Sequence, residues 1–142
     1  MSSDSIATDR TSVTLAVLVV EDEAIIRMLL VEELKDTGLV VVEADGADGA
    51  MAILGDGAAI GLVVTDVRMP GSTDGLGLAA WMREHAPGVP IVITSGFSTP
   101  PDCQAINPAI IRVVSKPYKP RDVVNLLAAL LAPMAQLSGP SQ

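Results

Sequence analysis

Five apolar runs recur along the chain and alternate with stretches of helical periodicity. Each run is continuous and rich in Val, Ile and Leu, which is typical of a strand covered on both faces, whereas a half-exposed strand alternates apolar and polar positions. The runs occupy residues 15–20, 39–43, 61–66, 89–94 and 110–114. Because parallel strands need crossover connections, this alternation predicts a parallel sheet with helices on both faces.

Helices are predicted after each strand, at residues 24–37, 47–54, 75–86, 102–106 and 120–132. Gly38 stands where a C-cap glycine belongs, and Pro133 is expected to end the last helix. The segment 98–108 contains three prolines, so it leaves room for only a shortened or irregular fourth helix.

The pattern describes one α/β domain, because a chain of 142 residues has no room for a second folded unit. We expect the domain to span residues 13–132, between a mobile N-terminal tail (1–12) and a C-terminal tail (133–142). No apolar run approaches the roughly 20 residues of a membrane span, and no signal peptide is visible. The predicted location is therefore the cytoplasm, with no membrane association.

Composition narrows the function classes further. The net charge is −8, with 17 acidic and 9 basic residues and no basic run, which argues against nucleic-acid binding because phosphates need Lys and Arg. One Trp, one Tyr and one Phe leave few stacking platforms for bases. The single cysteine, Cys103, rules out an internal disulfide and a cysteine-based zinc cluster.

Polar residues gather at the C-terminal ends of the predicted strands. The ends carry Glu21 and Asp22 on the first strand, Asp66 on the third, Thr94 and Ser95 on the fourth, and Lys116 on the fifth. In an open α/β sheet the ligand site lies outside the carboxyl ends of the strands. These side chains are therefore expected to share one basin.

Each member of this basin has a chemical task. Clustered carboxylates repel one another and need a divalent cation, and an all-oxygen ligand set favours Mg²⁺. Asp66 would attack phosphorus as the nucleophile, while Lys116 and Thr94 would bind oxygens of the transferred group. The residue types therefore predict a phosphoryl acceptor.

The chain resembles the receiver domain of bacterial two-component response regulators over residues 13–131. The motifs that carry the resemblance are Val-Val-Glu-Asp-Glu at 19–23, Thr-Asp-Val-Arg-Met-Pro-Gly at 65–71, Ile-Thr-Ser-Gly at 93–96 and Ser-Lys-Pro at 115–117. The resemblance implies a flavodoxin-like, doubly wound (βα)5 fold whose five-stranded parallel sheet has the order 2-1-3-4-5. Because about 11 residues remain after Leu131 and they do not resemble an output domain, we expect a stand-alone, single-domain receiver.

The resemblance further implies a role for each site residue. Asp66 would take a phosphoryl group from a histidine kinase or phosphotransfer protein, Thr94 would be the switch hydroxyl, and Lys116 would bind the phosphoryl group. Mg²⁺ would be bound by Glu21, Asp22, Asp66 and the backbone carbonyl of Arg68. Ser95 is the alternative hydroxyl.

On this interpretation the protein is not an enzyme, apart from its own Mg²⁺-dependent phosphorylation and dephosphorylation. It would signal through contact with an unknown downstream protein, as a monomer or weak dimer, or pass the phosphoryl group onward in a relay. The output face is expected near the fourth and fifth strand-helix units.

Two positions depart from the family pattern. Receivers often have an aromatic switch residue three positions before the lysine, where this chain has Val113. The second departure is the proline-rich segment 98–108, and Phe97, directly before it, is the only nearby aromatic residue. The switch in which an aromatic ring moves after phosphorylation therefore cannot operate in its usual form. One hypothesis is that the output instead runs through ordering and disordering of the proline-rich segment.

Other functions remain open at this level. One alternative is a receiver module that is part of a larger hybrid histidine kinase. A haloacid-dehalogenase-like phosphohydrolase also uses an Asp nucleophile on a doubly wound sheet, but that family has an acid two residues later, where this chain has Arg68. A binding module that keeps the fold without being phosphorylated is disfavoured by the complete set of acids and lysine.

The hypothesis about the proline-rich segment can be tested by amide exchange. If the segment carries the output, exchange across residues 97–107 should change when a phosphoryl mimic binds, because ordering protects backbone amides. Hydrogen-exchange mass spectrometry with and without the mimic measures this. Equal exchange in both states would exclude the segment as the output.

Overall fold

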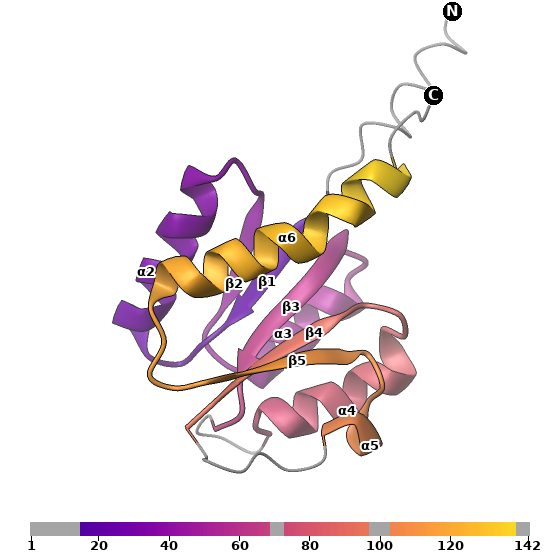
Figure 1. The fold of residues 1–142 in the computed structure, drawn as a ribbon. Coiled ribbons are helices and arrows are strands. Elements are labelled where there is room, and N and C mark those ends of the chain that lie inside the picture. Colours follow the sequence, from indigo (N-terminus) through magenta and orange to yellow (C-terminus); the bar gives the residue numbers. More distant parts are fainter. Residues whose placement is uncertain (1–14, 69–72, 97–102, 139–142) are drawn as a thin grey trace, which may run out of the picture.

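A five-stranded parallel sheet forms the centre of the protein (Figure 1). The computed structural model describes residues 15–68, 73–96 and 103–138, with side chains described up to residue 132. The strands are β1 (Ala16–Val20), β2 (Val41–Ala44), β3 (Ile60–Asp66), β4 (Ile91–Ser95) and β5 (Ile110–Ser115). Their order is β2-β1-β3-β4-β5, and every neighbouring pair is parallel, so the order expected from the sequence is confirmed.

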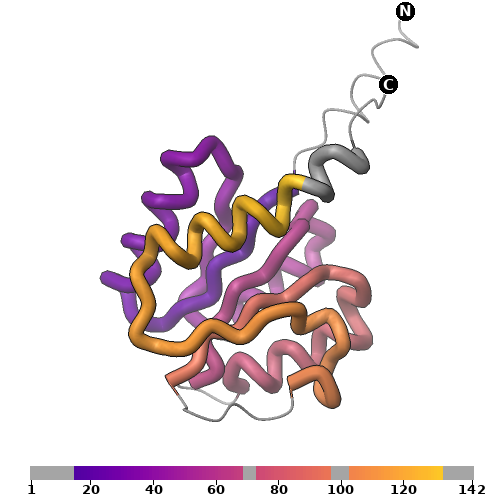
Figure 2. Tube along the Cα trace, in the orientation of Figure 1, coloured from indigo at the N-terminus to yellow at the C-terminus, as the bar shows by residue number. Residues whose placement is uncertain are grey.

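Helices cover both faces of this sheet. They are α2 (Ala24–Asp36), α3 (Ala47–Gly55), α4 (Gly75–His85), α5 (Cys103–Ile106) and α6 (Pro120–Ser138). Helices α2 and α6 lie side by side on one face, and α3, α4 and α5 cover the other (Figures 1 and 2). None of the helices in the described ranges is long and apolar enough to cross a membrane.

The strand runs are continuous because each side of the sheet has its own core. In β1, Val17 and Val19 pack into the layer under α2 and α6, whereas Leu18 and Val20 pack into the layer under α3 and α4. This alternation follows from the two-residue period of a strand. Strands β1, β3 and β4 are buried along their whole length, while β2 and β5 at the edges are partly exposed.

The helix boundaries follow the sequence signals with one exception. Gly38 has φ +89° directly after the C-cap of α2, as its predicted capping role requires. The short fourth helix is confirmed, since α5 has four residues. The predicted end of the last helix before Pro133 is wrong, because α6 continues to Ser138 through part of the expected tail.

The continuation of α6 past Pro133 has a local explanation. Proline removes one backbone donor, so the carbonyl of Ala129 loses its usual partner four residues later. The residues around Pro133 are mostly Ala, Leu, Met and Gln, which favour helix and compensate for one missing bond. The hypothesis about Phe97 concerns residues outside the described ranges.

The first turn of α4 lies directly against the backbone of Asp66. The amide of Gly75 donates to the carbonyl of Val67 at 2.9 Å, and the Asp74 side chain caps the helix by accepting from the amide of Gly77 at 2.9 Å. A Cβ atom on Gly75 would overlap the carbonyl oxygen of Asp66 and lie 2.8 Å from its carbonyl carbon. Only glycine lets the helix approach this strand end so closely.

The variant Gly75→Ala should therefore be destabilised by about 1–3 kcal/mol or more, the usual cost of overpacking. The clash is with backbone, which cannot rotate away. Urea denaturation measures the loss in free energy of unfolding.

Gly49→Ala is the matched control. Gly49 lies inside α3, and its added Cβ would be 3.5 Å from the Cβ of Ala44, an ordinary contact. Because alanine is the better helix former, this variant should be as stable as the wild type or more stable. Equal stability of the two variants would contradict the close packing at Gly75.

Candidate functional site

Asp66 and Lys116 form a close ion pair at the C-terminal edge of the sheet. Asp66 is the last residue of β3, and Lys116 directly follows β5. The Lys116 Nζ atom donates to Asp66 Oδ2 at 2.6 Å, and the two side chains are 25% and 8% exposed. A short hydrogen bond between charged groups is stronger than a neutral one. The pair therefore fixes one oxygen of a nearly buried carboxylate.

The other oxygen of Asp66 faces the backbone. The amide of Arg68 donates to Asp66 Oδ1 at 3.3 Å, and the hydroxyl of Thr65 donates to the Asp66 carbonyl at 3.1 Å. With an ammonium on one oxygen and an amide on the other, the carboxylate has a defined orientation. The Arg68 carbonyl, predicted as a metal ligand, belongs to this same turn.

Three acids converge at the same edge. One carboxylate oxygen from each of Glu21, Asp22 and Asp66 lies within 4.8 Å of the others. Glu21 is buried, and its Oε2 atom accepts from the amide of Glu23 at 3.1 Å. The three residues that the sequence predicted as carboxylate ligands are thus brought together.

Arg27 on α2 forms hydrogen bonds to the backbone of Glu21 and to the side chain of Glu43. Its Nη1 atom donates to the carbonyl of Glu21 at 2.8 Å, and its Nε atom donates to Glu43 Oε1 at 3.1 Å. One guanidinium on α2 therefore ties the end of β1 to β2. Sequence reasoning did not identify this residue, because its partners lie on two different strands.

Negative charge exceeds positive charge around Glu21. The pKa of Glu21 is raised from 4.5 to about 7, chiefly by burial and also by the charge of Asp66 and a hydrogen bond with Asp22, which together outweigh the lowering effects of the Glu23 amide and Lys116. A carboxyl that retains its proton so readily lacks a compensating cation. Three oxygen ligands at this spacing fit a hard divalent ion such as Mg²⁺.

Lys116 remains an ammonium in this setting. Burial by itself lowers its pKa, but the hydrogen bond and charge of Asp66, together with Glu21 and Glu23, outweigh burial and raise it. A lysine with a raised pKa is charged at neutral pH. It therefore provides a permanent positive charge beside Asp66.

A pocket of about 300 Å³ opens next to this pair. It is lined by Asp66, Arg68, Gly96 and Lys116. The carboxylate and the ammonium thus face the same open space. A small anionic group entering there would reach both.

The strand register distinguishes the two candidate hydroxyls. Thr94 is paired with Asp66 across β3 and β4, and its carbonyl accepts from the amide of Val67 at 2.9 Å. Ser95 is paired with Ser115, and its carbonyl accepts from the amide of Lys116 at 2.8 Å. Both residues are buried. The register therefore puts Thr94, and not Ser95, level with Asp66.

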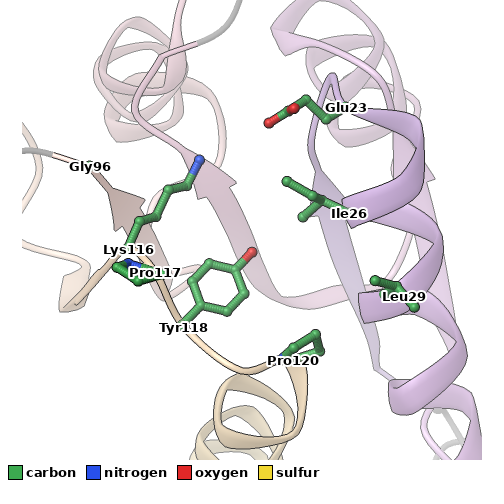
Figure 3. Close-up of a pocket in the computed structure, with 8 residues that line it drawn as sticks. All are labelled: Glu23, Ile26, Leu29, Gly96, Lys116, Pro117, Tyr118 and Pro120. Carbon is green, nitrogen blue, oxygen red and sulfur yellow. The ribbon is translucent and has the colours of Figure 1, made fainter.

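Tyr118 is a further residue beside the site that sequence reasoning missed. It lines a second pocket, of about 480 Å³, together with Lys116, Gly96 and the first turns of α2 (Figure 3). The available signal was its position two residues after Lys116, separated only by Pro117. Gly75 was identified only as a helix position, and its contact with the Asp66 backbone was not foreseen.

Comparisons with known proteins agree with this geometry. The family model described as the response regulator receiver domain matches residues 17–128. The chain is 35% identical over 130 residues to the transcriptional regulatory protein ResD of Bacillus subtilis, a match that covers 92% of this chain and 53% of ResD. The chain thus spans about half the length of that relative.

Two other similar proteins are covered almost completely. The response regulator receiver protein CpdR of Brucella abortus is 33% identical over 118 residues, which is 81% of this chain and 95% of CpdR. The crystal structure of the response regulator protein TrrA of Thermotoga maritima, in complex with Mg²⁺–BeF, superposes with a TM-score of 0.71. It is 28% identical and covers 83% of this chain and 100% of TrrA.

The raised pKa of Glu21 predicts a specific pH dependence of stability without divalent cations. In the unfolded chain Glu21 ionises near its ordinary value of 4.5, whereas in the folded protein it keeps its proton to about 7. Stability therefore falls as pH rises between these values, because the unfolded state releases its proton first. The variant Glu21→Gln has no titrating group at this position, so it should not lose this stability as the pH rises.

Urea denaturation at pH 5 and pH 8, with a chelator present, measures the effect. The stability of Glu21→Gln relative to the wild type should increase from pH 5 to pH 8 by on the order of 1–3 kcal/mol, since each pKa unit is worth about 1.4 kcal/mol. Comparing two pH values cancels any constant effect of the substitution. An unchanged difference would show that Glu21 is not held protonated.

Proposed function

This chain belongs to the family of response regulator receiver domains, the phosphoacceptor modules of two-component signalling, and we propose that Asp66 is its phosphoacceptor. The observation that carries the proposal is the convergence on one nearly buried carboxylate of an ammonium at 2.6 Å and two further acids. Both the pocket beside Asp66 and the Lys116 ammonium suit an incoming phosphoryl group.

In the proposed reaction an Asp66 carboxylate oxygen attacks phosphorus, the bond between phosphorus and the donor nitrogen or oxygen breaks, and an acyl phosphate forms. Lys116, which now donates to Asp66 Oδ2, is placed to donate to a phosphoryl oxygen instead. The Thr94 hydroxyl donates to another phosphoryl oxygen. Both contacts balance charge that grows on the transferred group.

We assign Mg²⁺ as the cofactor, bound by Glu21, Asp22, Asp66 and the backbone carbonyl of Arg68. When bound, the ion supplies positive charge that stabilises the transferring phosphoryl group. The shared acidic edge and the raised pKa of Glu21 support this assignment. The Mg²⁺–BeF complex of TrrA supports it by similarity.

The phosphodonor in this proposal is a histidine kinase or phosphotransfer protein in the cytoplasm. Helix α2 begins beside the acid cluster and exposes three large apolar side chains: Ile25 is 69%, Met28 50% and Leu29 45% exposed. The sequence pattern grouped Leu29 with the core, but the structure buries Val31 instead. Apolar side chains on this helix suit a protein donor better than a small molecule.

The downstream partner contacts a surface that changes with phosphorylation. Val113 on β5 is partly buried against the core and has no ring to move. If the partner binds the face formed by the fourth and fifth strand-helix units, a residue other than Val113 has to move when Asp66 is phosphorylated. As part of the proposal, the chemistry of the protein is limited to its own phosphorylation and dephosphorylation.

The proposal predicts a Mg²⁺-dependent covalent adduct. Wild-type protein incubated with Mg²⁺ and acetyl phosphate should gain the mass of one phosphoryl group, because a small acyl phosphate can replace the protein donor. Intact-mass spectrometry detects the adduct. Asp66→Asn should remain unmodified, since an amide is a poor nucleophile.

Two further variants sharpen this experiment. Asp22→Asn should raise the Mg²⁺ concentration needed by at least the roughly tenfold that lost outer-shell partners cost in metal sites. Asp45→Asn, which removes an exposed acid directly after β2, should behave as the wild type. An adduct that persists in Asp66→Asn, or steady hydrolysis of a phosphate monoester by the wild type, would overturn the assignment.

A further inference from the structure

The hydroxyl of Tyr118 is buried without a hydrogen-bond partner. Of the buried side-chain polar atoms in the described part of the chain, it alone lacks one. A buried donor without an acceptor is unfavourable, and native structures keep few such groups, so each needs an explanation. The explanation has to account for its position, two residues after Lys116.

Tyr118 lies on the segment between β5 and α6 and faces the first turns of α2 across the pocket (Figure 3). Figure 3 shows its ring between the side chains of Lys116 and Ile26, with the hydroxyl directed into the space that these residues and Glu23 surround. Glu23 and Lys116 extend towards one another across the same space (Figure 3). Tyr118 and Lys116 therefore line the same pocket.

The pocket of Tyr118 adjoins the pocket of Asp66. Both are lined by Gly96 and Lys116. Gly96 has no side chain and open space where a Cβ would be, and Lys116 is a flexible chain that is partly exposed. No bulky side chain is common to the two linings. The Tyr118 hydroxyl is also close enough to Asp66 for the charge of that carboxylate to raise the pKa of Tyr118.

Electrostatics keeps this hydroxyl protonated. Burial raises the pKa of Tyr118 to about 12, and the negative charges of Glu21, Asp66 and Glu23 contribute in the same direction. At physiological pH the residue is therefore always a donor. Phosphorylation adds three strong acceptor oxygens to the neighbouring pocket.

We propose that Tyr118 is a phosphoryl-sensing hydrogen-bond donor, whose hydroxyl is unpaired before phosphorylation and donates to a phosphoryl oxygen once Asp66 is phosphorylated. The inference rests on the proposed function of Asp66. Tyr118 then serves as the mobile aromatic residue that Val113 cannot be. Its ring shares a pocket with Ile26 and Leu29, so its movement alters the surface beside the exposed residues of α2.

The variant Tyr118→Phe tests the role of the hydroxyl alone, because it keeps the ring. Binding of beryllofluoride with Mg²⁺, measured by calorimetry, should weaken roughly tenfold or more, the effect expected for losing a hydrogen bond to a charged acceptor. The stability of the free protein in urea should stay the same or increase, because the deleted group has no partner. A merely structural hydroxyl would show the opposite, with lower stability and unchanged beryllofluoride affinity.

Thr37→Val is the matched control. The Thr37 hydroxyl donates to the carbonyl of Leu34 at 2.7 Å, at the far end of α2 from the acids. Losing this satisfied bond should lower stability and leave beryllofluoride affinity unchanged. The two hydroxyl deletions should therefore have reversed effects.

A direct observation uses the fact that Tyr118 is the only tyrosine of the chain. With tyrosine labelled by ¹³C at the ζ carbon, the wild type gives one resonance, which should shift when beryllofluoride and Mg²⁺ bind. An unchanged resonance with beryllofluoride bound, or equal affinity in Tyr118→Phe, would overturn this inference alone. Failure of the wild type to bind beryllofluoride and to form the acetyl phosphate adduct would instead overturn the proposed function.

Discussion

The ion pair between Asp66 and Lys116 joins positions 50 residues apart, and the rest of the site is arranged around it. It depends on β3 and β5 running in the same direction on either side of β4, because their C-terminal ends then meet at the same edge of the sheet. Burial makes the pair strong, since a carboxylate and an ammonium attract one another more where water is scarce. The same burial makes the neighbouring carboxylate of Glu21 costly to ionise. One ammonium cannot balance three acids, so this edge of the sheet carries an excess of negative charge.

The core and the C-terminal edge of the sheet differ in how fully their polar groups are paired. The two apolar layers on either side of the sheet are closely packed, and the described backbone at the strand ends is paired. Around Asp66, by contrast, one carboxyl tends to keep its proton and one buried hydroxyl has no partner. Unfavourable groups persist only where the surrounding fold is stable enough to hold them. In the function and the inference proposed above, a cation would lower the cost of ionising Glu21, and a phosphoryl oxygen would accept from the Tyr118 hydroxyl.

Much of this arrangement can be predicted from the sequence, and the failures have physical causes. Continuous apolar runs identified the strands, and the acids at the C-terminal ends of β1 and β3 identified the site, because strand ends in a parallel sheet share an edge. Periodicity grouped Leu29 with the core, but only neighbouring helices decide which side of an apolar helix is covered. Pro133 was expected to end α6, yet one lost hydrogen bond is a local cost that favourable neighbours compensate.

By itself, the sequence determined the order and type of most elements, the residues at the strand ends and the chemistry those residues support. These properties depend on local patterns and on residue identity. Only the tertiary structure decided that Lys116 pairs with Asp66, that Gly75 packs on the Asp66 backbone and that Tyr118 keeps a buried hydroxyl unpaired beside them. The reason is that burial and charge separation depend on distances between segments far apart in the chain, and no local pattern encodes these distances.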